Sequence, residues 1–144
     1  MYLTGGATAV LEGWRPSTVD VDVRFEPDSD AALRLIAELK ERLQVNVELA
    51  SPLDFLPPLK GWRERCRFRL RAGNLEVFDF DPYSQALSKL ERGFDLDLRD
   101  VAEMLRAGQV DPVRLLELYE EIEPELFKFP AVEPARLRRA VENL

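Results

Sequence analysis

Apolar and acidic residues alternate without a break in the stretch Val19-Asp20-Val21-Asp22-Val23. Side chains two positions apart on a β-strand point to the same face of the sheet. The pattern therefore predicts a strand over residues 19–25 that carries Asp20 and Asp22 on one face and the valines on the other. The Glu26-Pro27 pair that follows is expected to end this strand.

Four further stretches show strand periodicity. Residues 1–4 predict a short strand, and residues 45–49 predict another with Asn46 and Glu48 on one face. Residues 65–71 and 75–80 alternate on either side of an Ala-Gly-Asn turn, which predicts a β-hairpin. Arginine occupies every second position from Arg63 to Arg71, so the first strand of this hairpin is expected to be basic.

Helical spacing of apolar residues accounts for most of the remaining chain. A helix from about residue 30 to residue 43 is expected to be capped by Ser29 or Asp30. The Asp81-Pro82 and Asp111-Pro112 pairs are typical of helix starts, with the aspartate as cap and the proline in the first turn. The predicted helices span residues 7–12, 30–43, 82–92, 97–107, 112–122 and 134–144.

These elements predict an α/β (α+β) fold in which a mixed β-sheet with helices is followed by a helical C-terminal half. We expect one domain over residues 1–144, with the α/β part at 1–82 and the helical part at 83–144. A chain of 144 residues buries roughly 70% of its unfolded surface, which is enough for a substantial core.

Composition excludes several classes of site. The chain has no histidine, which removes His-based triads and imidazole acid–base catalysis, so any general base is expected to be Asp or Glu. The single cysteine, Cys66, excludes an internal disulfide, fits a cytoplasmic location and is expected to pack as a small apolar residue. No apolar run approaches the roughly 20 residues that span a membrane.

The net charge of −7 makes nucleic acid the less favoured partner. The arginines from Arg63 to Arg71 form either a local basic patch or, as we favour, the solvated face of an edge strand.

The acidic pair indicates chemistry. Two carboxylates side by side repel each other unless a cation neutralises them, and hard oxygen ligands suit Mg²⁺ or Mn²⁺. Gly5 and Gly6 lie upstream, between the first strand and the first helix, where paired glycines permit a tight turn and the approach of a phosphate. A metal site next to a phosphate-binding turn predicts a nucleoside triphosphate as ligand.

The Gly5-Gly6 turn, the short helix and the Asp20-x-Asp22 strand resemble the nucleotidyltransferase superfamily of polymerase-β-like and minimal nucleotidyltransferases. The run from Gly13 through Arg15, Ser17 and Thr18 to the aspartates is similar to a bacterial subgroup of largely uncharacterised members. The stretch with Lys89, which we expect at the surface, and Asp97-x-x-Asp100 is similar to the same subgroup. The resemblance covers residues 1–122.

The resemblance implies a set of site residues. Asp20, Asp22 and Glu48 would hold Mg²⁺ or Mn²⁺ and act as the catalytic residues, with Asp79 and Asp81 as rivals of Glu48 for the third position. Thr4 or Thr8 would replace the hydroxyl that many relatives supply from a serine in the glycine turn. The residues expected to contact the nucleotide are Gly5, Gly6, Arg15, Ser17 and Thr18.

The implied reaction is the transfer of a nucleoside monophosphate from a nucleoside triphosphate to a hydroxyl of a small molecule or protein. Two ions about 3.5–4 Å apart would stabilise the attacking and leaving oxygens. The alternative is a catalytically inactive relative that binds a protein encoded by a neighbouring gene, for example as one member of a toxin–antitoxin pair. The intact acidic pair favours the enzyme, whereas a glutamate in the third position favours the binding protein.

Overall fold

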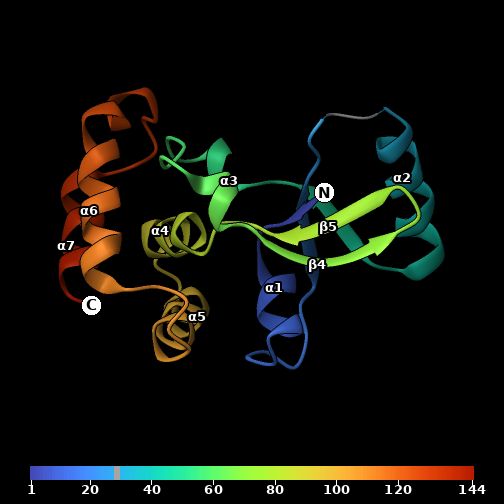
Figure 1. The fold of residues 1–144 in the computed structure, drawn as a ribbon, viewed down its shortest axis with the longest axis horizontal. Coiled ribbons are helices and arrows are strands. Elements are labelled where there is room, and N and C mark those ends of the chain that lie inside the picture. Colours follow the sequence, from blue (N-terminus) through green and yellow to red (C-terminus); the bar gives the residue numbers. More distant parts are fainter. Residues whose placement is uncertain (28–29) are drawn as a thin grey trace. The chain divides into compact units, whose positions relative to one another are not determined.

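The computed structural model describes residues 1–27 and 30–144, and for residues 33 and 39 it describes the backbone only. The chain forms two compact units (Figure 1). The sheet unit comprises residues 1–51 and 67–79, and the helical unit comprises residues 52–66 and 80–144. The helical unit therefore includes a segment, 52–66, that lies between two strands of the sheet unit in the sequence.

The sheet unit is a five-stranded mixed sheet in the order β3-β2-β1-β5-β4. Its elements are β1 (Tyr2–Leu3), α1 (Gly6–Leu11), β2 (Asp20–Arg24), α2 (Asp30–Leu43), β3 (Asn46–Leu49), β4 (Arg67–Ala72) and β5 (Leu75–Asp79). Strand β2 is antiparallel to β1 and parallel to β3, while β5 is parallel to β1 and antiparallel to β4. The predicted strands and both predicted helices of this region are confirmed, whereas the predicted cap Ser29 lies outside the described residues.

One face of the sheet carries the apolar core of this unit. Leu3, Val23 and Val77 from three strands pack with Ala7 of α1, and Ile36 of α2 packs against them. Helices α1 and α2 therefore contribute to the same core. The alternation along β2 then places Asp20 and Asp22 on the opposite face, as predicted.

Strand β4 differs from the prediction in two ways. Residues Trp62–Arg65 form a short helix, α3, so the strand begins at Arg67 and Arg65 belongs to the helical unit. The register also shifts between Phe68 and Leu70, because a bulge inserts Arg69. The bulge breaks the predicted alternation, and Phe68 and Leu70 on this edge strand are both exposed.

The helical unit contains the mainly helical C-terminal part of the chain. Its elements are two 3₁₀ helices, η1 (Pro52–Asp54) and η2 (Glu123–Lys128), and the α-helices α3 (Trp62–Arg65), α4 (Pro82–Arg92), α5 (Asp95–Arg106), α6 (Pro112–Ile122) and α7 (Pro134–Glu142). The predicted caps are confirmed for α4 and α6. The side chain of Asp81 accepts from the backbone N–H groups of Tyr83 and Ser84, and that of Asp111 accepts from Arg114.

The predicted fold class, a mixed sheet with helices followed by a mostly helical part, is confirmed. None of the helices in the described ranges is long and apolar enough to cross a membrane. The boundary between the units does not follow the predicted division at residue 82, because residues 52–66 pack with the C-terminal helices. That the two units act as one domain stays a prediction.

Candidate functional site

Strand pairing aligns four polar side chains on the face of the sheet opposite the core. In the parallel ladder of β2 and β3, Asp20 lies opposite Asn46 and Asp22 lies opposite Glu48. Residues opposite each other in a ladder project to the same face. The register therefore brings the two predicted aspartates and the predicted third acid to neighbouring positions. Asp20 and Asp22 are half-buried, and Glu48 is exposed.

The side chain of Asn46 connects two of these acids. Its Nδ2 donates to Oδ1 of Asp20 at 2.6 Å and to Oε1 of Glu48 at 3.0 Å. One amide nitrogen thus places partial positive charge between two carboxylates that would otherwise repel each other. Alternation along residues 45–49 predicts that Asn46 lies on this face beside Glu48, but it assigns no function to Asn46. That function depends on the one-to-one register between β3 and β2.

The predicted glycine turn lies directly against the acidic pair. A Cβ atom on Gly5 would collide with Oδ2 of Asp22, so only glycine lets the backbone come this close to the carboxylate. The φ angle of Gly5 is −139°, so the requirement is for space and not for left-handed backbone. The backbone N–H of Thr4 donates to the carbonyl of Asp22 at 3.1 Å, which fixes the turn beside β2.

Gly6 makes a second close approach. A Cβ at this position would lie 2.5 Å from Oγ1 of Thr18 and 3.2 Å from Nη1 of Arg15. The Thr18 hydroxyl donates to the backbone carbonyl of Asp20 at 2.9 Å. The loop that precedes β2 is therefore folded back onto the turn. Gly6, Arg15 and Thr18 converge, whereas the predicted contact residue Ser17 is exposed in the loop and makes none of these approaches.

The two threonines proposed to replace a serine hydroxyl differ in their surroundings. Oγ1 of Thr4 donates to the carbonyl of Ala50 at 2.5 Å and so ties the turn to the end of β3. Oγ1 of Thr8 is buried in α1 without a hydrogen-bond partner. Neither hydroxyl is directed to an open ligand position, so the replacement of the serine hydroxyl by Thr4 or Thr8 stays a prediction.

The donor chemistry of the acidic face fits a divalent cation. Two carboxylates on one strand face, one of them against bare glycine backbone, offer the hard oxygen ligands that Mg²⁺ and Mn²⁺ prefer. Within the described ranges, however, no three His, Cys, Asp or Glu side chains lie close enough together to hold a metal ion. The amide of Asn46 stands between Asp20 and Glu48 in this arrangement. The assignment of Asp20, Asp22 and Glu48 as metal ligands stays a prediction.

Asp79, one rival for the third position, lies on the core face of the sheet. Leu3 pairs with Val23 across β1–β2 and with Asp79 across β1–β5, which places all three side chains on one face. Asp79 is buried, and its Oδ2 accepts from Nε of Arg69 at 2.5 Å. Arg69 is also paired with Glu12, which follows the last residue of α1. Asp79 therefore faces away from Asp20 and Asp22.

Asp81, the other rival, caps α4 in the helical unit. It is fully buried and accepts from Nε and Nη2 of Arg65 at 2.8 and 2.9 Å. The hydroxyl of Ser84 donates to it at 2.6 Å, in addition to the backbone donors at the helix start. These bonds satisfy both carboxylate oxygens, so Asp81 is explained by its structural role.

Each arginine of the series has a partner within the chain, and four of the five are paired with carboxylates. Its partners are the Trp62 ring for Arg63, Asp81 for Arg65, Asp79 and Glu12 for Arg67 and Arg69, and Glu76 for Arg71. A guanidinium held by a carboxylate contributes less to the attraction of a polyanion. The pairing therefore does not favour a nucleic-acid surface along β4.

Lys89 was expected at the surface, and that expectation is wrong. Its side chain is only 5% exposed. Its Nζ lies 2.6 Å from Oδ2 of Asp100 and 3.5 Å from Oδ1 of Asp97, two carboxylates that are also buried. Arg92 pairs with Asp97 at 2.7 Å. The Lys89 and Asp97-x-x-Asp100 pattern is thus a buried ion-pair network that joins α4 to α5.

Cys66 is not activated as a nucleophile. Its Sγ donates to the backbone carbonyl of Trp62 at 3.3 Å. Burial raises the pKa of the Cys66 thiol to about 12 and so keeps it protonated at neutral pH. The expected role as a small packing residue fits this environment.

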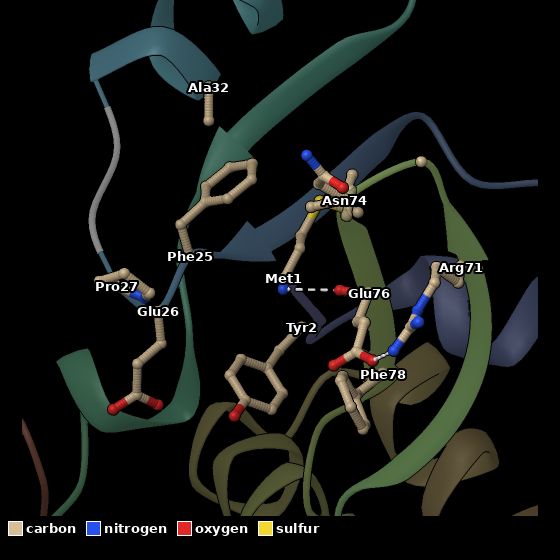
Figure 2. Close-up of a pocket in the computed structure, with 12 residues that line it drawn as sticks. Met1, Tyr2, Phe25, Glu26, Pro27, Ala32, Arg71, Asn74, Glu76 and Phe78 are labelled. Atoms are coloured by element: carbon tan, nitrogen blue, oxygen red, sulfur yellow. Dashed lines mark hydrogen bonds and ion pairs between the residues drawn. The ribbon is translucent and has the colours of Figure 1, made fainter.

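A cavity of about 690 Å³ opens at one end of the sheet unit (Figure 2). Phe25 and Pro27 border it on one side, Glu76 and Phe78 of β5 border it on the other, and Tyr2 lies beside Phe78 with 5.7 Å between the ring centroids. None of the residues predicted for the metal or the nucleotide lines this cavity. The cavity is therefore separate from the acidic face and the glycine turn.

A sequence model of one protein family matches residues 1–133, and its description is "Nucleotidyltransferase of unknown function (DUF6036)". This chain belongs to that family. The resemblance to nucleotidyltransferases is thereby confirmed, and a nucleotide substrate is implied. A search of curated proteins and a search of solved structures give no match.

Membership of the family identifies the class of reaction, nucleotidyl transfer, but it does not identify the substrate or the metal ion. Nucleotidyltransferases generally use divalent metal ions, which agrees with the oxygen donors on the acidic face. The predicted turn and acidic strand lie within the matched residues and touch each other through Gly5 and Asp22.

Proposed function

We propose that this nucleotidyltransferase transfers a nucleoside monophosphate from a nucleoside triphosphate to a hydroxyl group of a small molecule or protein. The observation that carries the proposal is the packing of Gly5 against the carboxylate of Asp22. A bare turn beside an acidic pair provides adjacent positions for a phosphate chain and for the cation that accompanies it. Membership of the family supports the same class of reaction.

Each residue would have a defined task. Asp20 and Asp22 would bind the divalent cation, and Gly5 and Gly6 would let the triphosphate approach the backbone. Arg15 and Thr18, which lie next to Gly6, would contact the phosphates. The bound ion would neutralise charge on the phosphates and on the leaving pyrophosphate.

In the transfer itself, the hydroxyl oxygen of the acceptor forms a bond to the α-phosphorus. The bond between the α-phosphorus and the bridging oxygen to the β-phosphate breaks, and pyrophosphate leaves with that electron pair. Glu48, the predicted third acid, would complete the cation site and help to accept the hydroxyl proton. An exposed carboxylate is suited to this exchange because it can pass the proton on to solvent.

The second candidate is an inactive relative that binds a nucleotide or a protein without catalysis. It is supported by the absence, within the described ranges, of three acidic or other metal-ligating side chains close enough together to hold a metal ion. Both candidates keep the acidic face, and they differ in whether a bound triphosphate is converted.

The test is calorimetric titration of ATP and of GTP in MgCl₂ and in EDTA, followed by measurement of pyrophosphate release. The proposal predicts binding that requires Mg²⁺ and that is lost in the Asp20→Ala/Asp22→Ala variant. A matched control is Glu38→Ala/Glu41→Ala, which removes two exposed carboxylates from α2 of the same unit and should bind like the wild type.

The outcomes separate the candidates. Binding with pyrophosphate release supports the transferase, provided that the release is also lost in the double variant. Binding without release, when hydroxyl acceptors are supplied, favours the inactive relative. If folded wild-type protein binds neither nucleotide in MgCl₂, the proposed function is refuted.

A further inference from the structure

We infer that Asn46 is a positioning residue of the acidic site, which orients Asp20 and Glu48 for a divalent cation. This inference rests on the proposed function, because it concerns the same site. Its evidence is separate, namely the two hydrogen bonds that a single side-chain nitrogen donates to two carboxylates on different strands.

The geometry explains why an amide suits this position. Nδ2 of an asparagine carries two hydrogens, and here one is directed to Asp20 and the other to Glu48. Each bond uses only one oxygen of its acceptor, Oδ1 of Asp20 and Oε1 of Glu48, so each carboxylate keeps a second oxygen for a cation. Asn46 therefore fixes the orientation of both acids.

The second argument for Asn46 concerns the repulsion between the carboxylates of the acidic site. Strand pairing places Asp20, Asp22 and Glu48 at neighbouring positions, where three negative charges repel one another before an ion binds. The amide offsets part of that repulsion by hydrogen bonding and adds no charge of its own. A carboxylate at position 46 would add a fourth charge, and an apolar side chain would leave the acids without a common partner.

A residue that hydrogen-bonds to metal-binding side chains influences the affinity of the site for its metal ion. Hydrogen bonds that orient metal-binding side chains are commonly worth 10- to 100-fold in metal affinity. The loss of the Asn46 amide should therefore weaken ion binding by about tenfold without removing any acid from the site.

The test uses Mn²⁺ alone as probe. Electron paramagnetic resonance of free Mn²⁺ gives its Kd for the wild type, Asn46→Ala and Asn46→Asp, and thermal unfolding is followed in EDTA and in Mn²⁺. Asn143→Ala is the matched control, because it makes the same change at the exposed end of α7 in the other unit. Far-UV circular dichroism establishes that each variant is folded.

The two variants should differ in how Mn²⁺ changes their unfolding temperatures. Asn46→Ala binds Mn²⁺ about tenfold more weakly than the wild type. Asn46→Asp unfolds at a lower temperature than Asn46→Ala in EDTA but gains more from Mn²⁺, because the added carboxylate supplies a new ligand. A residue that only supports strand pairing would lower both unfolding temperatures equally with and without Mn²⁺.

The failures can be told apart. Suppose that the wild type binds Mn²⁺, that Asp20→Ala/Asp22→Ala does not bind it, and that both Asn46 variants bind it with the wild-type Kd. The inference about Asn46 is then overturned, and the proposed function stands. If the folded wild type does not bind Mn²⁺, both fail. Asn46→Asp has the size of the native side chain and carries the test if Asn46→Ala does not fold.

Discussion

The burial of Lys89 makes a prediction that is large enough to be decisive. Replacing Lys89 by methionine keeps the length of the side chain and removes its charge. Asp100, which is 3% exposed and lies 2.6 Å from Nζ, would stay buried and lose its ion pair with Lys89. Asp97 would keep its pair with Arg92. Removal of one partner from a buried ion pair costs about 3–5 kcal/mol, and we expect about 3 kcal/mol because only Asp100 loses an ion pair at 2.6 Å.

The assay is urea unfolding followed by the fluorescence of Trp62 in a Trp14→Phe background. Trp62 reports on the helical unit because it is buried there and stacks on Phe80, with 4.6 Å between the ring centroids. Lys128→Met is the control, since Lys128 is an exposed lysine that pairs with an exposed glutamate, and it should cost at most about 1 kcal/mol.

A double-mutant cycle isolates the pair. In an Asp100→Asn background, Lys89→Met should cost much less than it does in the wild type, because no full charge is then abandoned at position 100. A cost below about 1 kcal/mol for Lys89→Met in the wild type would be the value of a surface lysine and would refute the reasoning.

Two further predictions concern the glycine turn and a buried tyrosine. Gly5→Ala should destabilise the protein by roughly 1–3 kcal/mol in urea unfolding and abolish nucleotide binding, because its Cβ would collide with the carboxylate of Asp22; wild-type binding in this variant would show that the close approach is dispensable. Burial and the hydrogen bond to Glu123 raise the pKa of Tyr119 from 10.0 to about 12, so the folded protein holds this proton more tightly than the unfolded chain. The contribution of Tyr119 to stability should therefore be complete below pH 10 and be lost as the pH rises from 10 to 12, and the loss of stability over that range should be smaller in Tyr119→Phe than in the wild type when unfolding is measured.

Local patterns were sufficient for most of the fold. Strict alternation identified β2 and the face that carries Asp20 and Asp22, and aspartate–proline pairs located the starts of α4 and α6. These features depend on residues close together in the chain, so they can be predicted from sequence. The glycine turn could also be predicted from the Gly5-Gly6 pair. Glycine is required at position 5 because a Cβ there would collide with the carboxylate of Asp22.

What could not be predicted depends on pairing between distant segments. The role of Asn46 follows from the register of β3 with β2, and no local pattern sets that register. The burial of Lys89 follows from the packing of α5 on α4, which supplies two carboxylates for one lysine. The bulge at Arg69 likewise arises from the match of β4 to β5, so the regular alternation of arginines gave a misleading expectation.

The order of strands in the sheet has a consequence for synthesis of the chain. Strand β1 lies in the middle of the sheet, and its partner on one side, β2, follows within about 20 residues, whereas Tyr2 pairs on the other side with Phe78. As the chain leaves the ribosome, the glycine turn, the acidic pair and Glu48 are all present once β3 has emerged. One edge of β1 stays open until β5 arrives, and such an open edge is a place where nascent chains associate wrongly. The segment that carries the candidate site is therefore also the one most in need of protection while the rest is being made.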